Sequence, residues 1–190
     1  MALPNQSFRL FGLIRYWNII QYFHPAKYLL DRDWKTVLTE FIPKFRQATD
    51  TLTFQLVLRQ LISTIEDGHA TLLIPTTHRL TGLALGLVPP FYTQLVGDTL
   101  LVTGIYSDSL SQLNGIHKGD RIIGVDGQSV ARRVDERSQY TTASNRAAKA
   151  QQVAPYLLAG TTPIIRLQVI QQGKLVERPV QRYSYQSFGY

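Results

Sequence analysis

The chain has 190 residues, of which 44% are hydrophobic and 17% are charged, so it can bury a core and is not a disordered protein. It contains no cysteine, which excludes disulfides, thiolate metal sites and cysteine nucleophiles. No apolar run approaches the roughly 20 residues that a transmembrane helix needs, so we expect no membrane span. The N-terminus lacks the basic-then-apolar pattern of a secretory signal.

The net charge of +7 is spread along the chain rather than concentrated in one patch. Because neither a helix-turn-helix nor a basic and aromatic RNA motif accompanies it, we interpret this charge as solvated surface and expect no nucleic-acid partner. The four histidines are scattered, and no two have the spacing of metal ligands on one helix. We therefore expect no metal site and no cofactor.

Residues 1–75 carry the hydrophobic periodicity of three helices. The predicted helices cover residues 7–23, about 34–45 and about 52–66, each with apolar side chains three or four residues apart. Since each apolar stripe needs a partner to bury it, the three helices predict a small bundle. A short strand is expected to follow at residues 70–74.

The ends of these helices carry residues that favour caps and stops. Ser7 can cap the first helix, and Pro25 ends it because proline cannot donate the next backbone hydrogen bond. The second and third helices have alternative caps, and a glycine is expected to end the third: Asp31 or Asp33, Thr51 or Thr53, and Gly68.

From residue 76 the composition shifts to threonine, glycine and proline, and the hydrophobic period changes from that of a helix to that of a strand. Tight turns are expected at Gly97-Asp98, at Asp126-Gly127 and around Gln172-Gly173-Lys174. The predicted strands cover residues 91–96, 99–105, 121–125, 128–130, 164–171 and 175–183, and one main helix covers residues 143–158.

The predicted fold class is therefore α+β, with a small N-terminal helical bundle followed by a mostly antiparallel β-domain that has one main helix. We expect four segments: a helical domain at 1–75, a boundary or linker at 76–88, the β-domain at 89–185 and a tail at 186–190.

The stretch from Leu113 to Val130 carries the most specific pattern in the chain. An apolar residue after a glycine precedes Gly119-Asp120, an apolar strand follows, and Asp126-Gly127 then turns the chain back. The glycine allows a tight turn into the strand, and the Asp120 carboxylate can bind nearby backbone amides. This pattern resembles the PDZ family, so the β-domain is expected to be PDZ-like.

The PDZ resemblance implies that an extended peptide adds as a strand beside a sheet edge. The groove would lie between the strand near Phe91 and the helix at 143–158. The peptide-binding residues implied in this way are Phe91, Tyr92, Thr93, Gln94, Leu95, Ala150 and Val153. Pro89 and Pro90 stand where PDZ domains usually capture a C-terminal carboxylate with backbone N–H groups, and proline has none. An internal peptide segment, or a neighbouring domain, suits this groove better.

Several short stretches carry a second resemblance. Residues 17–25, 33–34, 41–45 and 67–70 are similar, in this order, to the N-terminal region of tricorn-like, C-terminal-processing serine peptidases of the Bacteroidetes type. Two stretches of the β-domain, 140–145 and 154–160, are similar to the PDZ domain of the same group. In that group an α/β catalytic domain follows the PDZ domain, and the resemblance implies export to the bacterial periplasm or cell envelope.

The same resemblance implies a role for His69. In tricorn-like peptidases a histidine in such a helix-end loop is the general base for a serine in the later domain, and a histidine can titrate near neutral pH. The alternative is a capping histidine beside Asp67. No serine lies in a Gly-x-Ser-x-Gly or Ser-x-x-Lys arrangement, so we expect the nucleophile to lie outside this chain.

These observations leave two functions open. The first is the substrate-recognition and regulatory region of a serine endopeptidase of this family. It would bind peptides or unfolded protein segments, act with the catalytic domain, and not be proteolytic on its own. The second is a stand-alone, non-catalytic PDZ adaptor that binds peptides. A reading frame that continues past Tyr190 into further strands and helices would favour the peptidase.

Overall fold

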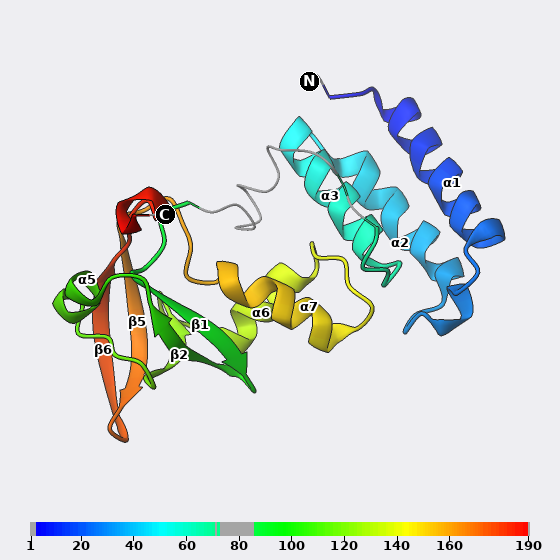
Figure 1. The fold of residues 1–190 in the computed structure, drawn as a ribbon. Coiled ribbons are helices and arrows are strands. Elements are labelled where there is room, and N and C mark those ends of the chain that lie inside the picture. The colour runs from blue at the N-terminus through cyan, green and yellow to red at the C-terminus, as the bar shows by residue number, and fades with distance from the viewer. Residues whose placement is uncertain (1–2, 71, 73–85, 190) are drawn as a thin grey trace. The chain divides into compact units, whose positions relative to one another are not determined.

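The computed structural model of the chain describes residues 3–70, 72 and 86–189, and the chain forms two compact units. The first comprises Met1–Thr77 together with Gln139–Asn145, and the second comprises His78–Ser138 together with Arg146–Tyr190. Most of the strand expected at 70–74 and most of the linker expected at 76–88 lie outside the described residues. The α+β class is confirmed by three N-terminal helices and an antiparallel sheet with its own helices (Figure 1).

The first unit is a bundle of α1 (Gln6–Phe23), α2 (Trp34–Gln47) and α3 (Thr51–Ser63), with a short 3-10 helix η1 (Lys27–Leu29) between the first two (Figure 1). Two tryptophans join α1 to α2, because each indole N–H donates to the other residue's carbonyl, at 2.9 Å from Trp17 and 3.1 Å from Trp34. The buried apolar core is formed by Leu13, Trp34, Val37, Phe41, Phe45, Val57, Leu61 and Ile65.

The helix caps differ in part from those predicted. Asn5 caps α1 instead of Ser7, and its side-chain oxygen accepts from the Phe8 N–H at 2.8 Å. Asp33, one of the two expected alternatives, caps α2. Asp50 caps α3 in place of either threonine, and it accepts from the Thr53 N–H at 2.8 Å. Ser7, Thr51 and Thr53 lie inside the first turns of α1 and α3, which begin at Gln6 and Thr51, so Asn5 and Asp50 occupy the N-cap positions.

The end of α3 also differs from the prediction. The helix ends at Ser63 rather than near Glu66, and Glu66, not Gly68, has the positive φ of 56°. The Glu66 carboxylate accepts the backbone N–H of Asp31 at 3.0 Å, and this contact ties the loop after α3 to the loop before α2.

Three phenylalanines of helix α1 lie on its exposed side. Phe8, Phe11 and Phe23 are 66%, 60% and 79% exposed, whereas Arg9 and Leu13 are buried. The Arg9 guanidinium lies 5.7 Å from the centre of the Phe54 ring and donates to the Ala48 carbonyl. Since α1 has apolar residues on all sides, periodicity alone could not select the buried face.

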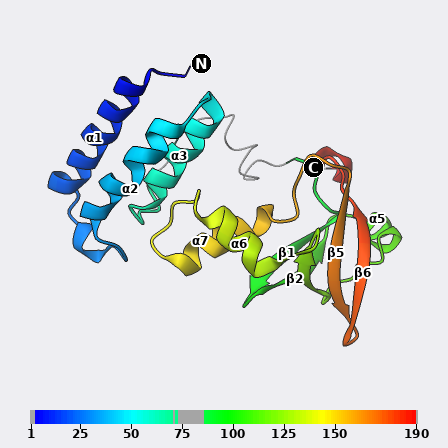
Figure 2. The ribbon, with the colours of Figure 1, turned by 180° about the vertical axis from the view of Figure 1, so that it is seen from behind.

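The second unit contains one antiparallel sheet of six strands (Figures 1 and 2). Five strands follow the order β1-β2-β3-β5-β6, and β4 pairs with β3. The strands are β1 (Phe91–Val96), β2 (Thr99–Ile105), β3 (Arg121–Val125), β4 (Gln128–Ser129), β5 (Ile164–Gln171) and β6 (Lys174–Gln181). The predicted turn at Asp126-Gly127 is confirmed, and the turn predicted around Gln172-Gly173-Lys174 forms at Gln172-Gly173, with Lys174 already in β6. All four turn residues have positive φ, as a primed turn requires.

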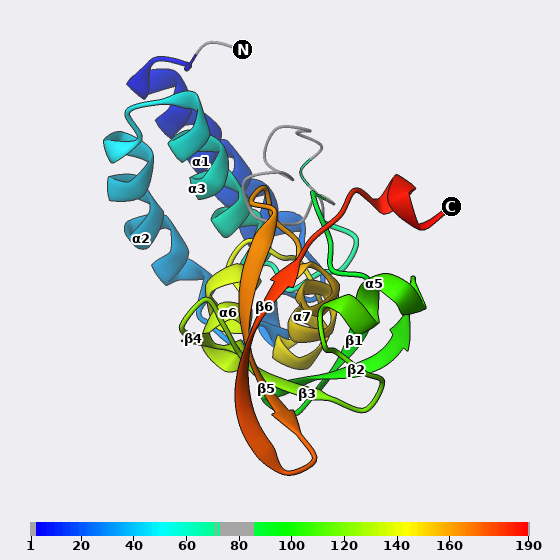
Figure 3. The same cartoon turned by 90° about the vertical axis from the view of Figure 1, so that its left-hand side faces the viewer.

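In the part of the second unit that the structure describes, three α-helices accompany this sheet, where one main helix was expected (Figure 3). They are α5 (Asp108–Leu113), α6 (Val130–Ser138) and α7 (Arg146–Val153), and two 3-10 helices follow at η2 (Ala154–Tyr156) and η3 (Tyr185–Phe188). The helix predicted at 143–158 is therefore shorter, since α7 ends before Pro155 and continues as η2. Helix α6 escaped prediction because only Val130 and Val134 are buried in a stretch rich in charged residues.

The turn before β3 confirms the roles predicted for Gly119 and Asp120. Gly119 has φ of 96°, which favours glycine, and the Asp120 carboxylate accepts the His117 N–H at 2.8 Å. The same carboxylate accepts from the Gln171 side chain of β5 at 2.6 Å. Asp120 is 9% exposed, so its two hydrogen bonds fix the turn against the core of the sheet.

We predict that Asp120→Ala destabilises the second unit by about 1–3 kcal/mol, because it removes the charged acceptor of two part-buried hydrogen bonds, from the His117 N–H and the Gln171 side chain. Urea unfolding followed by far-UV circular dichroism measures this loss. Asp108→Ala, which removes an exposed carboxylate from the first turn of α5, serves as the control and should change stability by less than about 0.5 kcal/mol. Equal effects of the two substitutions would contradict this account of the turn.

Candidate peptide-binding groove and histidine loop

Strand β1 is the outer strand at one end of the sheet order, so no other strand of the described residues pairs with the second side of its backbone. Val96 and Thr99 close the hairpin, and alternation from this pair directs the backbone groups of Thr93 and Leu95 away from β2. Within the described residues, no hydrogen bond engages the N–H of either residue. The edge therefore offers two free donors to an added strand.

Helix α7 lies beside this edge (Figure 3). The Gln151 side-chain amide donates to the Leu95 carbonyl at 3.3 Å, which independently confirms that this carbonyl points outward. Leu95 and Ala150 line one cavity between the strand and the helices. Strand β1 and helix α7 thus form two walls of a groove, with Gln151 holding one acceptor that an added strand would use.

The end of the groove at the start of β1 is closed by the chain itself. Leu87 and Gly160 exchange backbone hydrogen bonds of 2.8 and 3.0 Å, and Val88 and Tyr183 exchange two of 2.8 Å. The next two residues, Pro89 and Pro90, have no N–H to donate. The four residues before β1 therefore present no free backbone donor to a C-terminal carboxylate.

The seven residues expected to bind peptide occupy different environments. Phe91 and Val153 are 2% and 0% exposed and belong to the core, so they support the groove from beneath. Leu95 and Ala150 line the cavity, and Thr93 is half-buried on the same side of β1. Tyr92 and Gln94 alternate to the exposed side. The Tyr92 ring packs on Tyr106 with ring centres 5.1 Å apart, and Tyr106 packs in turn on Tyr185 and Phe188.

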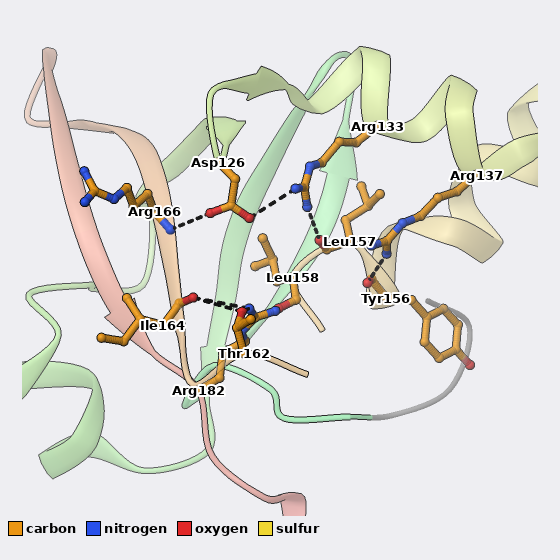
Figure 4. A network of polar contacts seen from close by, with 10 residues as sticks. All are labelled: Asp126, Arg133, Arg137, Tyr156, Leu157, Leu158, Thr162, Ile164, Arg166 and Arg182. Carbon is orange, nitrogen blue, oxygen red and sulfur yellow. Dashed lines mark hydrogen bonds and ion pairs between the residues drawn. The ribbon is translucent and has the colours of Figure 1, made fainter. Parts of the chain in front are cut away.

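Three arginines hold the segment that follows α7 (Figure 4). Arg133 donates to the Leu157 carbonyl at 3.3 Å, Arg137 to the Tyr156 carbonyl and Arg182 to the Leu158 carbonyl at 3.3 Å. These carbonyls lie at the end of the helical segment, where cations are favoured. The arginines therefore fix the point at which the helical wall of the groove ends.

One carboxylate connects this arginine cluster to the sheet. Asp126 accepts from the Arg133 guanidinium at 3.1 Å and from the Arg166 backbone N–H at 2.9 Å (Figure 4). Burial, followed by the charges of Arg133 and Arg182, lowers the pKa of Arg137 to about 10, which still leaves its guanidinium charged at neutral pH. Burial also lowers the pKa of Arg182, whose guanidinium packs where a Cβ at Gly160 would overlap it.

His69 lies in the loop after α3, in the first unit. Its imidazole Nδ1 is 3.0 Å from a carboxylate oxygen of Asp67, and the same oxygen accepts the His69 backbone N–H at 2.8 Å. The His69 side chain is fully exposed. The backbone N–H of His69, and then its imidazole, hold the pKa of the Asp67 carboxyl below its ordinary value. The pair combines a base with a carboxylate that orients it, and it is equally compatible with a loop cap.

Among the described residues, no group of three or more histidine, aspartate or glutamate side chains could hold a metal ion. The same part of the chain contains no helix with the length and apolar character needed to cross a membrane.

Sequence reasoning missed Gln151, Asp98 and the α6 residues of the groove. The missed residues are polar or small, so hydrophobic periodicity carries no information about them.

Comparison with known proteins identifies what this chain is similar to. Residues 104–181 match the family model of the N-terminal domain of Bacteroidetes S41-family peptidases. No curated protein gives a significant match to the sequence.

Solved structures share the fold at low sequence identity. A structure of mature CPAF in complex with lactacystin has a TM-score of 0.62 and 17% identity, over 93% of this chain and 35% of that chain. A mutant form of CPAF gives 0.60 and 18%, over 94% and 34%. The photosystem II D1 C-terminal processing protease gives only 0.41 and 14%, over 95% and 44%. The chain thus spans about a third of the CPAF structures, and the family match and the shared fold support the N-terminal region of an S41-type peptidase.

We predict that His69→Ala raises the Asp67 pKa only part of the way to the ordinary aspartate value, because the backbone N–H, the larger contributor, remains. NMR titration of the Asp67 carboxyl carbon measures the shift. His24→Ala, which removes only a weak charge contribution, should raise the pKa less. An Asp67 pKa that does not respond to His69→Ala would contradict the contact between the two side chains.

Proposed function

We propose that this chain is the substrate-recognition and regulatory region of a serine endopeptidase of the tricorn-like, C-terminal-processing family, and that it is not proteolytic on its own. The observation that carries the proposal is the unpaired edge of β1 beside α7, with two outward N–H groups at Thr93 and Leu95. A strand added there gains backbone hydrogen bonds irrespective of its sequence, and the cavity beside Leu95 supplies side-chain selection.

In this proposal the second unit is a PDZ-like domain that binds peptides or unfolded protein segments. Tyr92, Thr93, Gln94, Leu95 and Ala150 contact the bound peptide, while Phe91 and Val153 support the groove from the core. The helical domain at 1–75 and the PDZ-like domain at 89–185 act together with a catalytic domain. The parent enzyme works in the bacterial periplasm or cell envelope, as the match to a Bacteroidetes peptidase family suggests.

His69 is proposed as the general base for a serine supplied by the catalytic domain. Three features support this role: an exposed imidazole, a carboxylate at 3.0 Å that can orient it, and a place in the loop after α3. The groove itself contributes recognition rather than chemistry, since no motif of an activated serine occurs in the sequence.

We predict that the purified 190-residue chain neither hydrolyses unfolded casein nor reacts with a fluorophosphonate probe, because it lacks an activated serine. Both assays should give the signal of a buffer blank. Hydrolysis by this chain that His69→Ala abolishes, while His117→Ala leaves it intact, would overturn the proposal that the nucleophile lies elsewhere.

We predict that a free C-terminal carboxylate gives no more than about a twofold gain in peptide affinity, since the closed end of the groove offers no backbone donor for it. An array of decapeptides synthesised both as free acids and as amides, probed with the labelled chain, measures the ratio. A tenfold or greater preference for the free acids would contradict this assignment of the closed end.

A further inference from the structure

A cavity of about 500 Å³ opens at the end of the groove farther from Pro89 and Pro90. Its lining comes from β1, the turn after β1, α6 and α7, all within the second unit. Five of the lining side chains are apolar: Leu95, Ala131, Val134, Ala147 and Ala150. Three of these five are alanines. The alanines matter because any larger residue at these positions would extend into the cavity. The volume is within the range of ligand pockets, roughly 300–1,000 Å³.

Charged side chains also line the cavity. Asp135 of α6 and Arg146 of α7 form an ion pair at 3.0 Å, so their charges compensate each other. Asp98, in the turn after β1, also lines the cavity and is exposed. Within the described residues, no hydrogen bond or ion pair engages the Asp98 carboxylate. The cavity therefore has an apolar wall and one uncompensated negative charge, in a chain whose net charge is +7.

We propose that this cavity selects a lysine or arginine side chain of an internal, extended peptide segment. The inference rests on the proposed function, in which β1 accepts a peptide strand. A lysine or arginine matches both features, because its aliphatic stem can lie on apolar side chains while its charged end reaches Asp98. A purely apolar side chain would leave the Asp98 carboxylate unused, and an acidic side chain would be repelled by it.

The geometry of strand addition places such a side chain at the cavity. Alternate residues of an added strand face the same side as Thr93 and Leu95, which is the side of the helices. A peptide residue beside Leu95 would therefore direct its side chain into the cavity. The peptide would have to replace Gln151 at the Leu95 carbonyl, and it could continue in both directions because no carboxylate site fixes its end.

Three fluorescent decapeptides test the proposal. They share a threonine-rich host sequence, are acetylated and amidated, and carry Lys, Ala or Glu at one central position. Their affinities for the 190-residue chain are measured by fluorescence anisotropy at about 0.15 M ionic strength, which screens long-range attraction. The chain's positive net charge favours the Glu peptide in any non-specific binding, so a preference for Lys runs against this background.

We expect the Lys peptide to bind about three- to tenfold more tightly than the Ala peptide, and the Glu peptide to bind most weakly. Asp98→Asn should remove the preference for Lys over Ala. Asp108→Asn removes the same charge from α5, outside the cavity, and should retain the preference. Ala147→Leu should weaken binding of the Lys peptide, because the new side chain fills the cavity.

NMR chemical shifts of the Thr93 and Leu95 amides separate the possible failures. If all three peptides shift these amides with equal affinity, β1 binds peptides as proposed but the selection of a cationic side chain is wrong. If no peptide shifts them, the proposed peptide-binding function fails as well. Shifts that grow with protein concentration in the absence of peptide would assign the cavity to a second copy of the chain and overturn the proposal.

Discussion

The groove depends on one set of contacts, the donation of three arginine guanidinium groups to successive carbonyls at the end of the α7–η2 segment. Arg133 and Arg137 come from α6, whereas Arg182 follows β6, so the segment is held from two directions. Removing water from such cations is costly, and the downward shift of the Arg137 pKa reflects that cost. The contacts are therefore maintained because the carbonyls and Asp126 replace the lost hydration. Rigid placement of α7 beside β1 follows from this arrangement.

The sequence predicts elements whose stabilising residues are close along the chain. The turns at Gly119 and at Asp126-Gly127 were predictable because positive φ and the Gly-Asp pattern are local properties. The buried face of α1 was not, since apolar residues surround this helix and only its partners decide which side is buried. The groove, too, was predictable only in part. The strand at 91–96 was predicted from its alternation, and its place beside a groove from the PDZ resemblance, but the cavity is formed by small side chains from two helices, which no local pattern encodes.

The closed end of the groove and the open cavity have complementary consequences for recognition. At the closed end, Leu87 and Val88 give their backbone groups to Gly160 and Tyr183, and the prolines that follow have none to give. Under the proposed function, selectivity would therefore come from side chains along the strand rather than from a peptide terminus. A protein that reads internal segments in this way depends on its targets being locally extended, because a folded segment cannot present a free backbone edge.

The two outer strands of the sheet differ in how accessible they are to pairing. Along β6, alternation from the turn at Gln172-Gly173 directs the backbone groups of Pro179 and Gln181 outward. Pro179 has no N–H, and the N–H of Gln181 is already bound to the Asn114 side chain at 2.7 Å. In the C-terminal half of β6 two successive outward donors are thus unavailable, whereas within the described residues no hydrogen bond engages those of Thr93 and Leu95 on β1. An added strand therefore cannot pair along the C-terminal half of β6, which limits edge-to-edge aggregation there, and under the proposed function β1 is the edge that receives a peptide.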